Sequence, residues 1–447
     1  MARRTRRQVL KSTSFIGVAG VTATAGCLGD TSDDVDEVRI GTVHPVSGDL
    51  AYYGEISLTG FFSGLAYKHD VDPITSTAPG QYTMETDERT YQVFIEDSEF
   101  SADTAQQRAT DLVVDKEVDI LFGATSSDST RRLIETVIPD ANVPLMIAPA
   151  ADADITSDPT YCNDLVYRTS EHNAMDARAG GEALAVTDDE IDTIAIFGAD
   201  YSFGYSGARN YRLVFEDAGV DVLEERFVPV GYSEFDGLFD EAVDQGADAV
   251  VGVFTASTLP QFISSGFQFD VRILGAFSDL LTTQLVGQTI QREFGEDFTA
   301  SDLNEARFGP FSTRYHWNQY DNEINDRFTE MHIEHYGSVP DLFSSGTFTA
   351  ASAIVQAVDQ AESLGPDDLT GELRGMSVEE TPKGRGGYEF GLQNNQARSA
   401  MSIAQPVPTA EEFADTWDAV IQPSEPLAQV SADDAMPPED EIECDLR

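Results

Sequence analysis

Basic residues are scarce in this chain of 447 residues, and lysine is the scarcest of the charged types. Four lysines are present, and 27 lysines and arginines stand against 79 aspartates and glutamates, for a formal net charge of -52. Such a negative surface repels phosphate, which argues against a nucleic-acid partner. The acidic residues are spread through every segment. This spread indicates a halophilic surface, adapted to molar salt, where a Debye length of about 3 Å screens self-repulsion.

Long apolar runs are also missing, and no stretch is long and apolar enough to be a transmembrane helix. Apolar residues still make up 41% of the chain, which is enough for ordinary cores and excludes disorder as the cause of the charge. A chain of this length favours two domains over one.

The first 26 residues read as an export label. Paired arginines at Arg3-Arg4 and Arg6-Arg7 precede a short, mildly apolar run at 15–25, as in twin-arginine signal peptides. The run ends in Ala25-Gly26-Cys27, which resembles the lipobox of bacterial and archaeal lipoproteins. That resemblance implies a lipid on Cys27 that anchors the protein to the extracellular face of the cytoplasmic membrane. Twin-arginine export carries folded proteins, so the domain is expected to fold before export. The alternative is a start of chance composition followed by an ordinary buried cysteine.

An acidic, polar segment at 27–37 follows and is expected to be a flexible tether. The other two cysteines, Cys162 and Cys444, are expected to form a disulfide with each other. Export permits a disulfide, and once Cys27 is set aside the number of cysteines is even. The Pro-rich, acidic end at 426–447 is expected to be a tail.

From residue 38 onward, apolar runs of strand length alternate with stretches of helical periodicity. Strands are expected at 38–43, 91–97, 118–123 and 144–148, with helices at 54–67, 103–113 and 128–137. This alternation is typical of a parallel sheet with helices on both faces.

A second run of the same kind follows residue 169. Strands are expected at 193–197, 222–227, 249–254 and 272–276, with helices at 204–218, 238–245 and 259–266. Open parallel sheets bind ligands at the carboxyl ends of their strands. The chain is therefore expected to be an α/β protein of two Rossmann-like lobes with a ligand cleft between them.

Six local signatures resemble one family, the Leu/Ile/Val-binding-protein-like solute-binding proteins of ABC transporters. They are 40–48 with Tyr53-Gly54, 97–109, 123–130, 144–151, 167–169 and 201–204. Each is weak alone, whereas their order and spacing between residues 38 and 392 are specific. The resemblance implies a type I periplasmic binding fold with two lobes joined by a three-strand hinge. Mapped on this chain, lobe one is 38–168 plus 310–375, and lobe two is 169–309 plus 376–425.

Loops at strand ends supply the candidate ligand-binding residues. Thr125, Ser126 and Ser127 offer hydroxyls and backbone N–H groups at a helix N-terminus, which suits a carboxylate. The same residues can instead be helix caps. The resemblance implies that Ser127 binds the ligand carboxylate and that Ala150 and Asp152 flank the ligand.

Two positions depart from the family's pattern. Asp152 stands where members that bind branched-chain amino acids tend to have threonine, so it is expected to repel a ligand carboxylate or attract an ammonium. The lobe-two acid that holds the amino group falls near Phe277, an aromatic residue. Either Asp279 takes that role or the ligand lacks an α-amino group. Further candidates for the pocket wall, which ordinary packing also explains, are Tyr52, Tyr53, Phe203, Thr255 and Ala256.

These features predict an extracellular solute-binding subunit that serves the permease of an ABC importer and closes on a small polar solute. A branched-chain or other amino acid is the first expectation, and an amide or urea is the next. The alternative is a sensory lipoprotein that presents an amino acid to a membrane chemotaxis transducer, because such a protein needs the same closure. No enzyme, metal or cofactor is expected, because His44, His172 and His316 stand in no triad or metal-ligand spacing.

Overall fold

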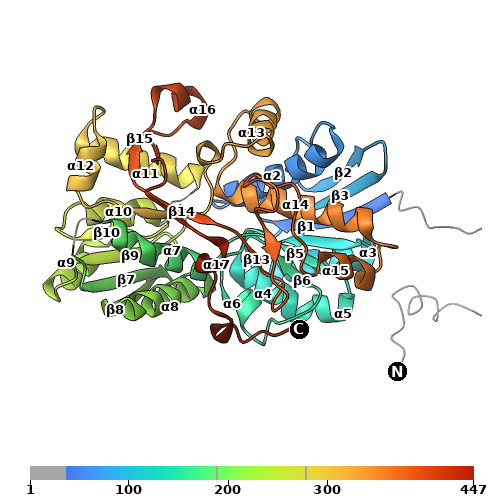
Figure 1. The fold of residues 1–447 in the computed structure, drawn as a ribbon, viewed down its shortest axis with the longest axis horizontal. Coiled ribbons are helices and arrows are strands. Elements are labelled where there is room, and N and C mark those ends of the chain that lie inside the picture. The colour runs from blue at the N-terminus through green and yellow to red at the C-terminus, as the bar shows by residue number, and fades with distance from the viewer. Residues whose placement is uncertain (1–36, 188–189, 277–278) are drawn as a thin grey trace, which may run out of the picture.

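The computed structural model describes residues 37–187, 190–276 and 279–447, which form two lobes side by side along the long axis (Figure 1). The expected signal peptide, Cys27, the tether up to residue 36 and Phe277 lie outside the described residues. Among the helices that the structure describes, none combines the length and apolarity needed to span a bilayer.

Lobe one is built on a six-stranded sheet with the order β2-β3-β1-β4-β5-β6. In that order its strands span Gly80–Glu85, Thr90–Asp97, Glu37–His44, Ile120–Gly123, Leu145–Ile147 and Val166–Arg168. Neighbours pair in parallel, except that β2 runs antiparallel to β3 at the edge. Along β4, Ile120 and Phe122 enter one apolar cluster and Leu121 enters another. The sheet is therefore buried on both faces, as parallel sheets are.

Helices cover both faces of this sheet. One face carries α2 (Tyr52–His69), α13 (Glu323–Tyr336), α14 (Leu342–Gln360) and α15 (Pro366–Leu373), and the other carries α3 (Ala102–Asp115), α4 (Ser127–Thr136) and α5 (Ile138–Ala141). Helices α2 and α14 approach closely at Gly60 and Gly64. A Cβ at Gly64 would lie 2.4 Å from the carbonyl oxygen of Phe348, so this contact requires glycine.

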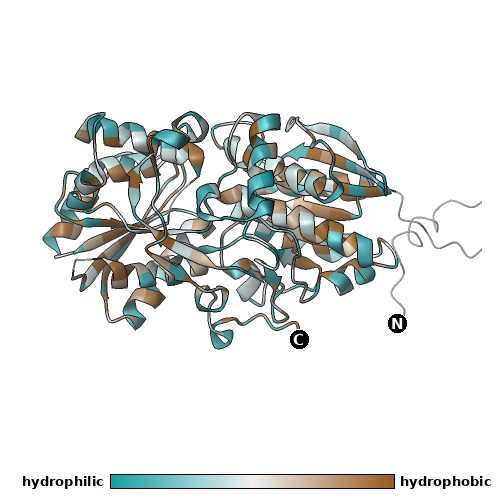
Figure 2. Cartoon of the chain, turned by 45° about the horizontal axis from the view of Figure 1, so that its top comes forward, coloured by the Kyte–Doolittle hydropathy of each residue, from teal (hydrophilic) through white to brown (hydrophobic). Residues whose placement is uncertain are grey.

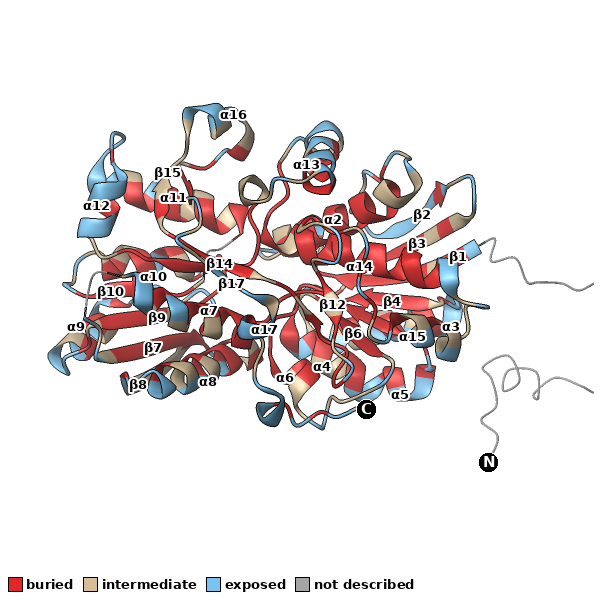
Figure 3. Ribbon diagram, viewed as in Figure 1, coloured by how far each residue is buried: buried red, intermediate tan, exposed pale blue. Residues whose placement is uncertain are grey.

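Lobe two is built on a fully parallel, four-stranded sheet with the order β10-β9-β7-β8. In that order the strands span Arg272–Leu274, Ala249–Val253, Thr193–Ala199 and Asp221–Val228. One face carries α7 (Asn173–Val186) and α8 (Ser202–Asp217), and the other carries α9 (Asp236–Asp244), α10 (Leu259–Gly266), α11 (Leu280–Phe294) and α12 (Ala300–Glu305). Figures 2 and 3 show the inner strands of both sheets as predominantly apolar and buried. The expected α/β fold of two parallel-sheet lobes is confirmed.

A small antiparallel sheet, β11-β14-β17, lies between the lobes. Its strands span Phe311–Thr313, Met401–Ala404 and Ala428–Val430. The chain passes between the lobes after β6, after β11 and before β14. A hairpin of β15 (Pro406–Pro408) and β16 (Ile421–Pro423), carrying α16 (Ala414–Trp417), belongs to lobe two.

The segment 376–398 lies in lobe one, whereas the resemblance placed it in lobe two. Its residues Tyr388, Phe390 and Ala397 join the apolar cluster of lobe one, and the ring of Phe390 packs edge-on against Tyr167 at 5.3 Å. The short pair β12 (Glu389–Phe390) and β13 (Ala397–Arg398) forms here. The crossing into lobe two therefore comes about twenty residues later than the family pattern implied.

The end of the chain is not a tail, contrary to expectation for 426–447. It adds β17 to the hinge sheet and α17 (Ala432–Ala435) to α7, burying Val430 and Ala435. It then returns to lobe one, where Cys444 forms a disulfide with Cys162, with their Cα atoms 5.3 Å apart. The C-terminal segment is thus a fourth connection between the lobes.

Candidate functional site

A cavity of about 110 Å³ lies between the two lobes. A water molecule needs about 10–15 Å³ of such space, so the cavity has room for a small solute. Lobe one contributes Tyr53, Phe100, Thr125, Ser127, Pro149, Ala151, Leu342 and Phe343. Lobe two and the hinge contribute, among others, Asn173, Asp176, Tyr201, Phe203, Thr255, Asp279 and Arg314. The loops after β4, β5, β7, β9 and β10 supply most of these residues, so the cavity lies at the carboxyl ends of both sheets.

The structure brings only some of the expected site residues to this cavity. Those that line it are Tyr53, Thr125, Ser127, Phe203, Thr255 and Asp279. Ser126, Ala150 and Asp152 do not line it. Ser126 is the N-cap of α4, where its hydroxyl accepts a hydrogen bond from the backbone N–H of Ser129 at 3.4 Å.

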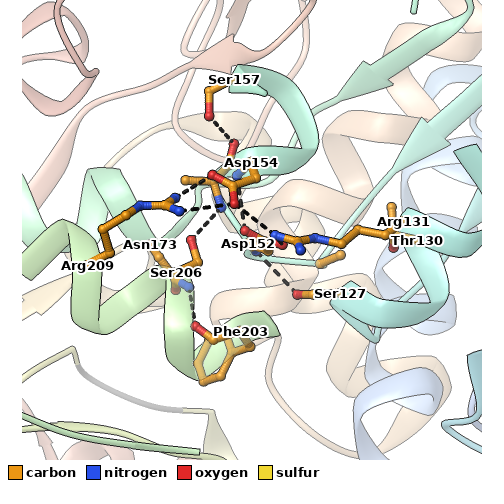
Figure 4. Close-up of polar contacts among 12 residues, drawn as sticks. Ser127, Thr130, Arg131, Asp152, Asp154, Ser157, Asn173, Phe203, Ser206 and Arg209 are labelled. Carbon is orange, nitrogen blue, oxygen red and sulfur yellow. Dashed lines mark hydrogen bonds and ion pairs between the residues drawn. The ribbon is translucent and has the colours of Figure 1, made fainter. Parts of the chain in front are cut away.

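Asp152 belongs to an ion-pair cluster beside the cavity (Figure 4). Its buried carboxylate pairs with Arg131 and accepts a hydrogen bond from the backbone N–H of Asp154 at 3.0 Å. Asp154 in turn pairs with Arg131 at 2.9 Å and with Arg209. Burial raises the pKa of Asp152, and the charge of Arg131 opposes that rise. The structure thus assigns Asp152 to the packing of α4 against α6 (Asp154–Ser157), which corrects its expected action on the ligand's head group.

The loop before α4 presents two hydroxyls and the helix N-terminus to the cavity. The Thr125 hydroxyl lies 2.9 Å from Nδ1 of His44, and burial lowers the pKa of His44 to about 3, so this imidazole is neutral. The Ser127 hydroxyl accepts a hydrogen bond from the backbone N–H of Asp152 at 3.3 Å. Helix N-termini carry partial positive charge, so this end of the cavity favours an anionic group.

Several contacts join the lobes across the cavity, so the structure shows a closed arrangement. The Tyr53 hydroxyl of lobe one accepts a hydrogen bond from the backbone N–H of Ala256 in lobe two at 2.7 Å. The Ser206 hydroxyl of lobe two accepts one from the backbone N–H of Ala153 at 3.0 Å.

Two buried carboxylates face this interlobe boundary, one from each lobe. Asp279 caps α11, accepting hydrogen bonds from the backbone N–H and the hydroxyl of Thr282 at 2.9 and 2.7 Å. Asp341 caps α14 and accepts a hydrogen bond across the boundary from the backbone N–H of Leu280 at 3.3 Å. Burial and the negative charge of Asp279 raise the pKa of Asp341 to about 6.

Several residues that line the cavity were not among the predicted site residues, namely Phe100, Asn173, Asp176, Tyr201, Arg314 and Phe343. The most consequential is Arg314, which follows β11 and pairs with Asp176 in the first turn of α7. One available signal was its setting, an arginine directly after the strand-like run Phe311-Ser312-Thr313 in a chain with few basic residues. Within the described part of the chain, no group of three or more His, Cys, Asp or Glu residues is placed to hold a metal ion.

Comparison with known proteins agrees with this architecture. The family model for periplasmic binding protein matches residues 37–411. The Leu/Ile/Val-binding protein homolog 6 of Brucella suis biovar 1 is 23% identical over 332 residues, which cover 72% of this chain and 76% of that protein.

Two solved structures from Rhodopseudomonas palustris share the fold. One, from strain CGA009, is described as an ABC-type branched-chain amino acid transporter, with a TM-score of 0.65, 21% identity and coverage of 90% of this chain and 98% of that one. The other, from strain BisB5, is a solute-binding protein of an ABC transporter in complex with 3,4-dihydroxybenzoic acid, with a TM-score of 0.68, 17% identity and coverage of 89% and 98%. At these identities the two structures show the fold alone. Because the family match runs through both lobes and their hinge, the chain belongs to the periplasmic binding protein family.

Proposed function

We propose that the protein is the solute-binding subunit of an ABC importer and captures a small polar solute, an amino acid in the first place, by closing its two lobes. The observation that carries the proposal is the cavity itself, whose walls come from both lobes and are bridged by the Tyr53–Ala256 hydrogen bond. A site divided in this way is complete only when the lobes are closed, so solute binding and closure are linked.

The chemistry of the cavity supports a zwitterionic solute. Thr125, Ser127 and the N-terminus of α4 suit a carboxylate, and the buried carboxylate of Asp279 suits an ammonium group. In this proposal Asp279 takes the place of the acid expected near Phe277. The aromatic rings of Tyr53, Phe203 and Phe343 also line the cavity and exclude water from the remainder of the solute.

A thermal-shift screen of amino acids, amides and urea in molar salt tests the proposal. A bound solute stabilises the closed protein by mass action, about 2.7 kcal/mol at one hundred times its Kd, so a true ligand raises the melting temperature. A screen in which no amino acid shifts the melting temperature contradicts the amino-acid assignment.

Replacement of Ser127 tests the carboxylate end of the site. Ser127→Ala is expected to weaken the binding of a carboxylate ligand by about 1–3 kcal/mol, because it removes a hydroxyl that would hydrogen-bond the carboxylate within a buried site. Ser126→Ala is the matched control: it removes the cap of α4, costing about 1 kcal/mol of stability, without changing a residue that lines the cavity. Equal affinities in calorimetry for the wild type and Ser127→Ala limit the Ser127 hydroxyl to its hydrogen bond from the backbone N–H of Asp152.

We further propose that residues 1–26 direct export of the folded protein and that lipid on Cys27 holds it at the membrane. The tether then lets the two-lobed body reach a permease. Cys27→Ala is expected to release the protein into the medium, as measured by fractionation of cells and culture supernatant. Continued retention in the membrane fraction refutes the anchor.

A further inference from the structure

A buried ion pair forms part of the cavity wall on the hinge side. Arg314 donates from Nε to Oδ1 of Asp176 at 2.8 Å, and its Nη2 pairs with Oδ2 of the same carboxylate. Both side chains are buried and both line the cavity. Asp176 thus engages two of the three guanidinium nitrogens. The third, Nη1, carries two further N–H groups that Asp176 does not engage.

Asn173 lies three residues before Asp176 on α7, so the two side chains share a face of the helix. Its Nδ2 donates a hydrogen bond to the carbonyl oxygen of Phe203 at 2.8 Å (Figure 4). Because a carbonyl can only accept, this contact fixes the orientation of the amide group. Oδ1 of the same planar group is therefore the atom that can accept a hydrogen bond, and Asn173 is itself a residue that lines the cavity.

We propose that Asn173, Asp176 and Arg314 form an amide subsite that recognises a carboxamide or urea group of the solute. Nη1 of Arg314 donates to the carbonyl oxygen of that group, and Oδ1 of Asn173 accepts from its N–H. A planar amide offers this combination of one acceptor beside a donor. The inference deepens the proposed function, on which it rests, because it names the side chain that the captured solute carries.

The charges of the cavity favour an amide over a carboxylate at this subsite. The charged lining residues are Asp176, Asp279 and Arg314, and the first and last neutralise each other. A second carboxylate on the solute would meet a guanidinium that is already paired, in surroundings where an uncompensated charge is costly. A neutral amide gains the same hydrogen bonds without that cost.

Calorimetry with ligands of matched shape tests the subsite on the full chain in molar salt. Asparagine and leucine differ little in size, as do glutamine and methionine, but only the first of each pair carries an amide. A site built to hydrogen-bond a group rejects the analogue that lacks it, so asparagine or glutamine is expected to bind roughly 100-fold more tightly than its apolar counterpart. Aspartate is expected to bind more weakly than asparagine. Leucine and methionine that bind as tightly as the amides overturn the inference.

Two variants locate the effect. Asn173→Ala removes the acceptor without touching the ion pair and is expected to reduce the ratio of asparagine affinity to leucine affinity at least about tenfold. Arg314→Lys keeps a positive charge beside Asp176 but loses Nη1, and the same result is expected. If Arg314→Lys does not fold, Asn173→Ala decides alone. Asn210→Ala, on α8 and outside the cavity lining, is the matched control. An equal loss for both ligands in Asn173→Ala overturns the subsite.

The outcomes separate this inference from the proposed function. Equal binding of asparagine and leucine upholds amino-acid capture and refutes the amide subsite. If no amino acid binds, acetamide and urea are the probes, since they carry the amide group without the zwitterionic end. Their binding to the wild type and its loss in Asn173→Ala uphold the subsite while refuting the amino-acid proposal. Failure of every probe refutes both.

Discussion

The lobes meet in two places, the hinge and the cleft, and the two are built differently. At the hinge, the carboxylate of Glu171 accepts hydrogen bonds from Lys383, Tyr388 and Ser399 at 2.7, 2.7 and 2.6 Å, and all four side chains are fully buried. Despite its burial, the charge of Lys383 lowers the pKa of Glu171. At the cleft, single hydrogen bonds such as Tyr53–Ala256 and a half-exposed ion pair between Arg209 and Asp154 join the lobes beside a cavity.

The difference indicates which contacts are permanent. A buried, fully hydrogen-bonded charge network is expensive to separate, so the hinge stays assembled in every state of the molecule. Single hydrogen bonds and half-exposed ion pairs are worth about 1 kcal/mol or less each, and those between the lobes can form only on closing. Changes to the Glu171 network should therefore alter stability and leave solute affinity alone, and changes at the cleft should do the reverse.

The largest effect is expected from Lys383→Met. This variant leaves the carboxylate of Glu171 buried without its cation, which costs about 3–5 kcal/mol of unfolding free energy. Guanidinium unfolding curves with and without solute measure the loss, which should be the same in both. Lys116→Met, at an exposed lysine, is the control and should stay within about 0.5 kcal/mol of the wild type. A Lys383→Met protein that is as stable as the wild type contradicts the permanent hinge.

The next effect is expected from removing the disulfide that ties the C-terminal segment to lobe one. Cys162 and Cys444 are 282 residues apart, so their bond restricts a long loop in the unfolded chain. The double alanine variant is expected to lose about 2–4 kcal/mol of stability, measured by thermal unfolding under oxidising conditions. Unchanged solute affinity places this fourth connection with the hinge, whereas a large loss of affinity would place it with the cleft.

A smaller effect, of the opposite kind, is expected from Tyr53→Phe. It removes a hydrogen bond between the lobes and is expected to weaken solute binding by about 1 kcal/mol, or about fivefold, without lowering the melting temperature of the free protein. Tyr82→Phe, whose hydroxyl bonds only within lobe one, is the control.

Tryptophan fluorescence gives a direct readout of closure for this variant. Both tryptophans of the chain, Trp317 and Trp417, belong to one apolar cluster that also holds Val339 of lobe one and Leu280 of lobe two. Solute should change their emission in the wild type and in Tyr53→Phe alike, at a higher concentration in the variant. A Tyr53→Phe protein with lower stability and unchanged affinity inverts the expected division between hinge and cleft.

The sequence predicted the parts of this molecule that depend on local pattern. The apolar runs that became β1, β3, β4, β7 and β9 were recognisable because each is a short, largely buried strand followed by a helix or by the loop that opens one. Thr125 and Ser127 were recognisable for a related reason: they follow a strand and open a helix, which brings them to the ligand edge of a parallel sheet.

The parts that depend on distant contacts were not predictable in the same way. Arg314 and Asp176 are 138 residues apart, and only the crossing of the hinge brings them together. The segment 376–398 belongs to lobe one because Tyr388 and Phe390 find an apolar cluster there, which no local spacing indicates. The role of Asp152 was not predicted because its carboxylate is paired with Arg131, which lies in α4, an earlier element of the chain.

The smallest effect expected is a dependence of solute affinity on pH, which originates at the cleft. Closure brings Asp341 against the N-terminus of α11, where burial and the charge of Asp279 raise its pKa to about 6, and the other titratable groups that face it are the hydroxyls of Tyr52 and Tyr315. In the open state we expect the carboxyl to lie farther from Asp279 and nearer to water, so that its pKa is closer to the ordinary value of about 3.9.

Between these two values the closed state holds a proton that the open state lacks, so affinity rises as the pH falls through 6 and levels off near 4. Because the pKa of the open state lies above the ordinary value, the rise stays below the roughly tenfold limit that these two values set between pH 8 and pH 5. Calorimetry at pH 8, 6 and 5 measures it, and Asp341→Asn, which retains a good helix cap, should flatten the profile. If Asp341→Asn keeps the wild-type pH profile, the titrating group is not Asp341. If the solute affinity of the wild type falls toward acid pH, closure releases protons at this boundary instead of taking them up.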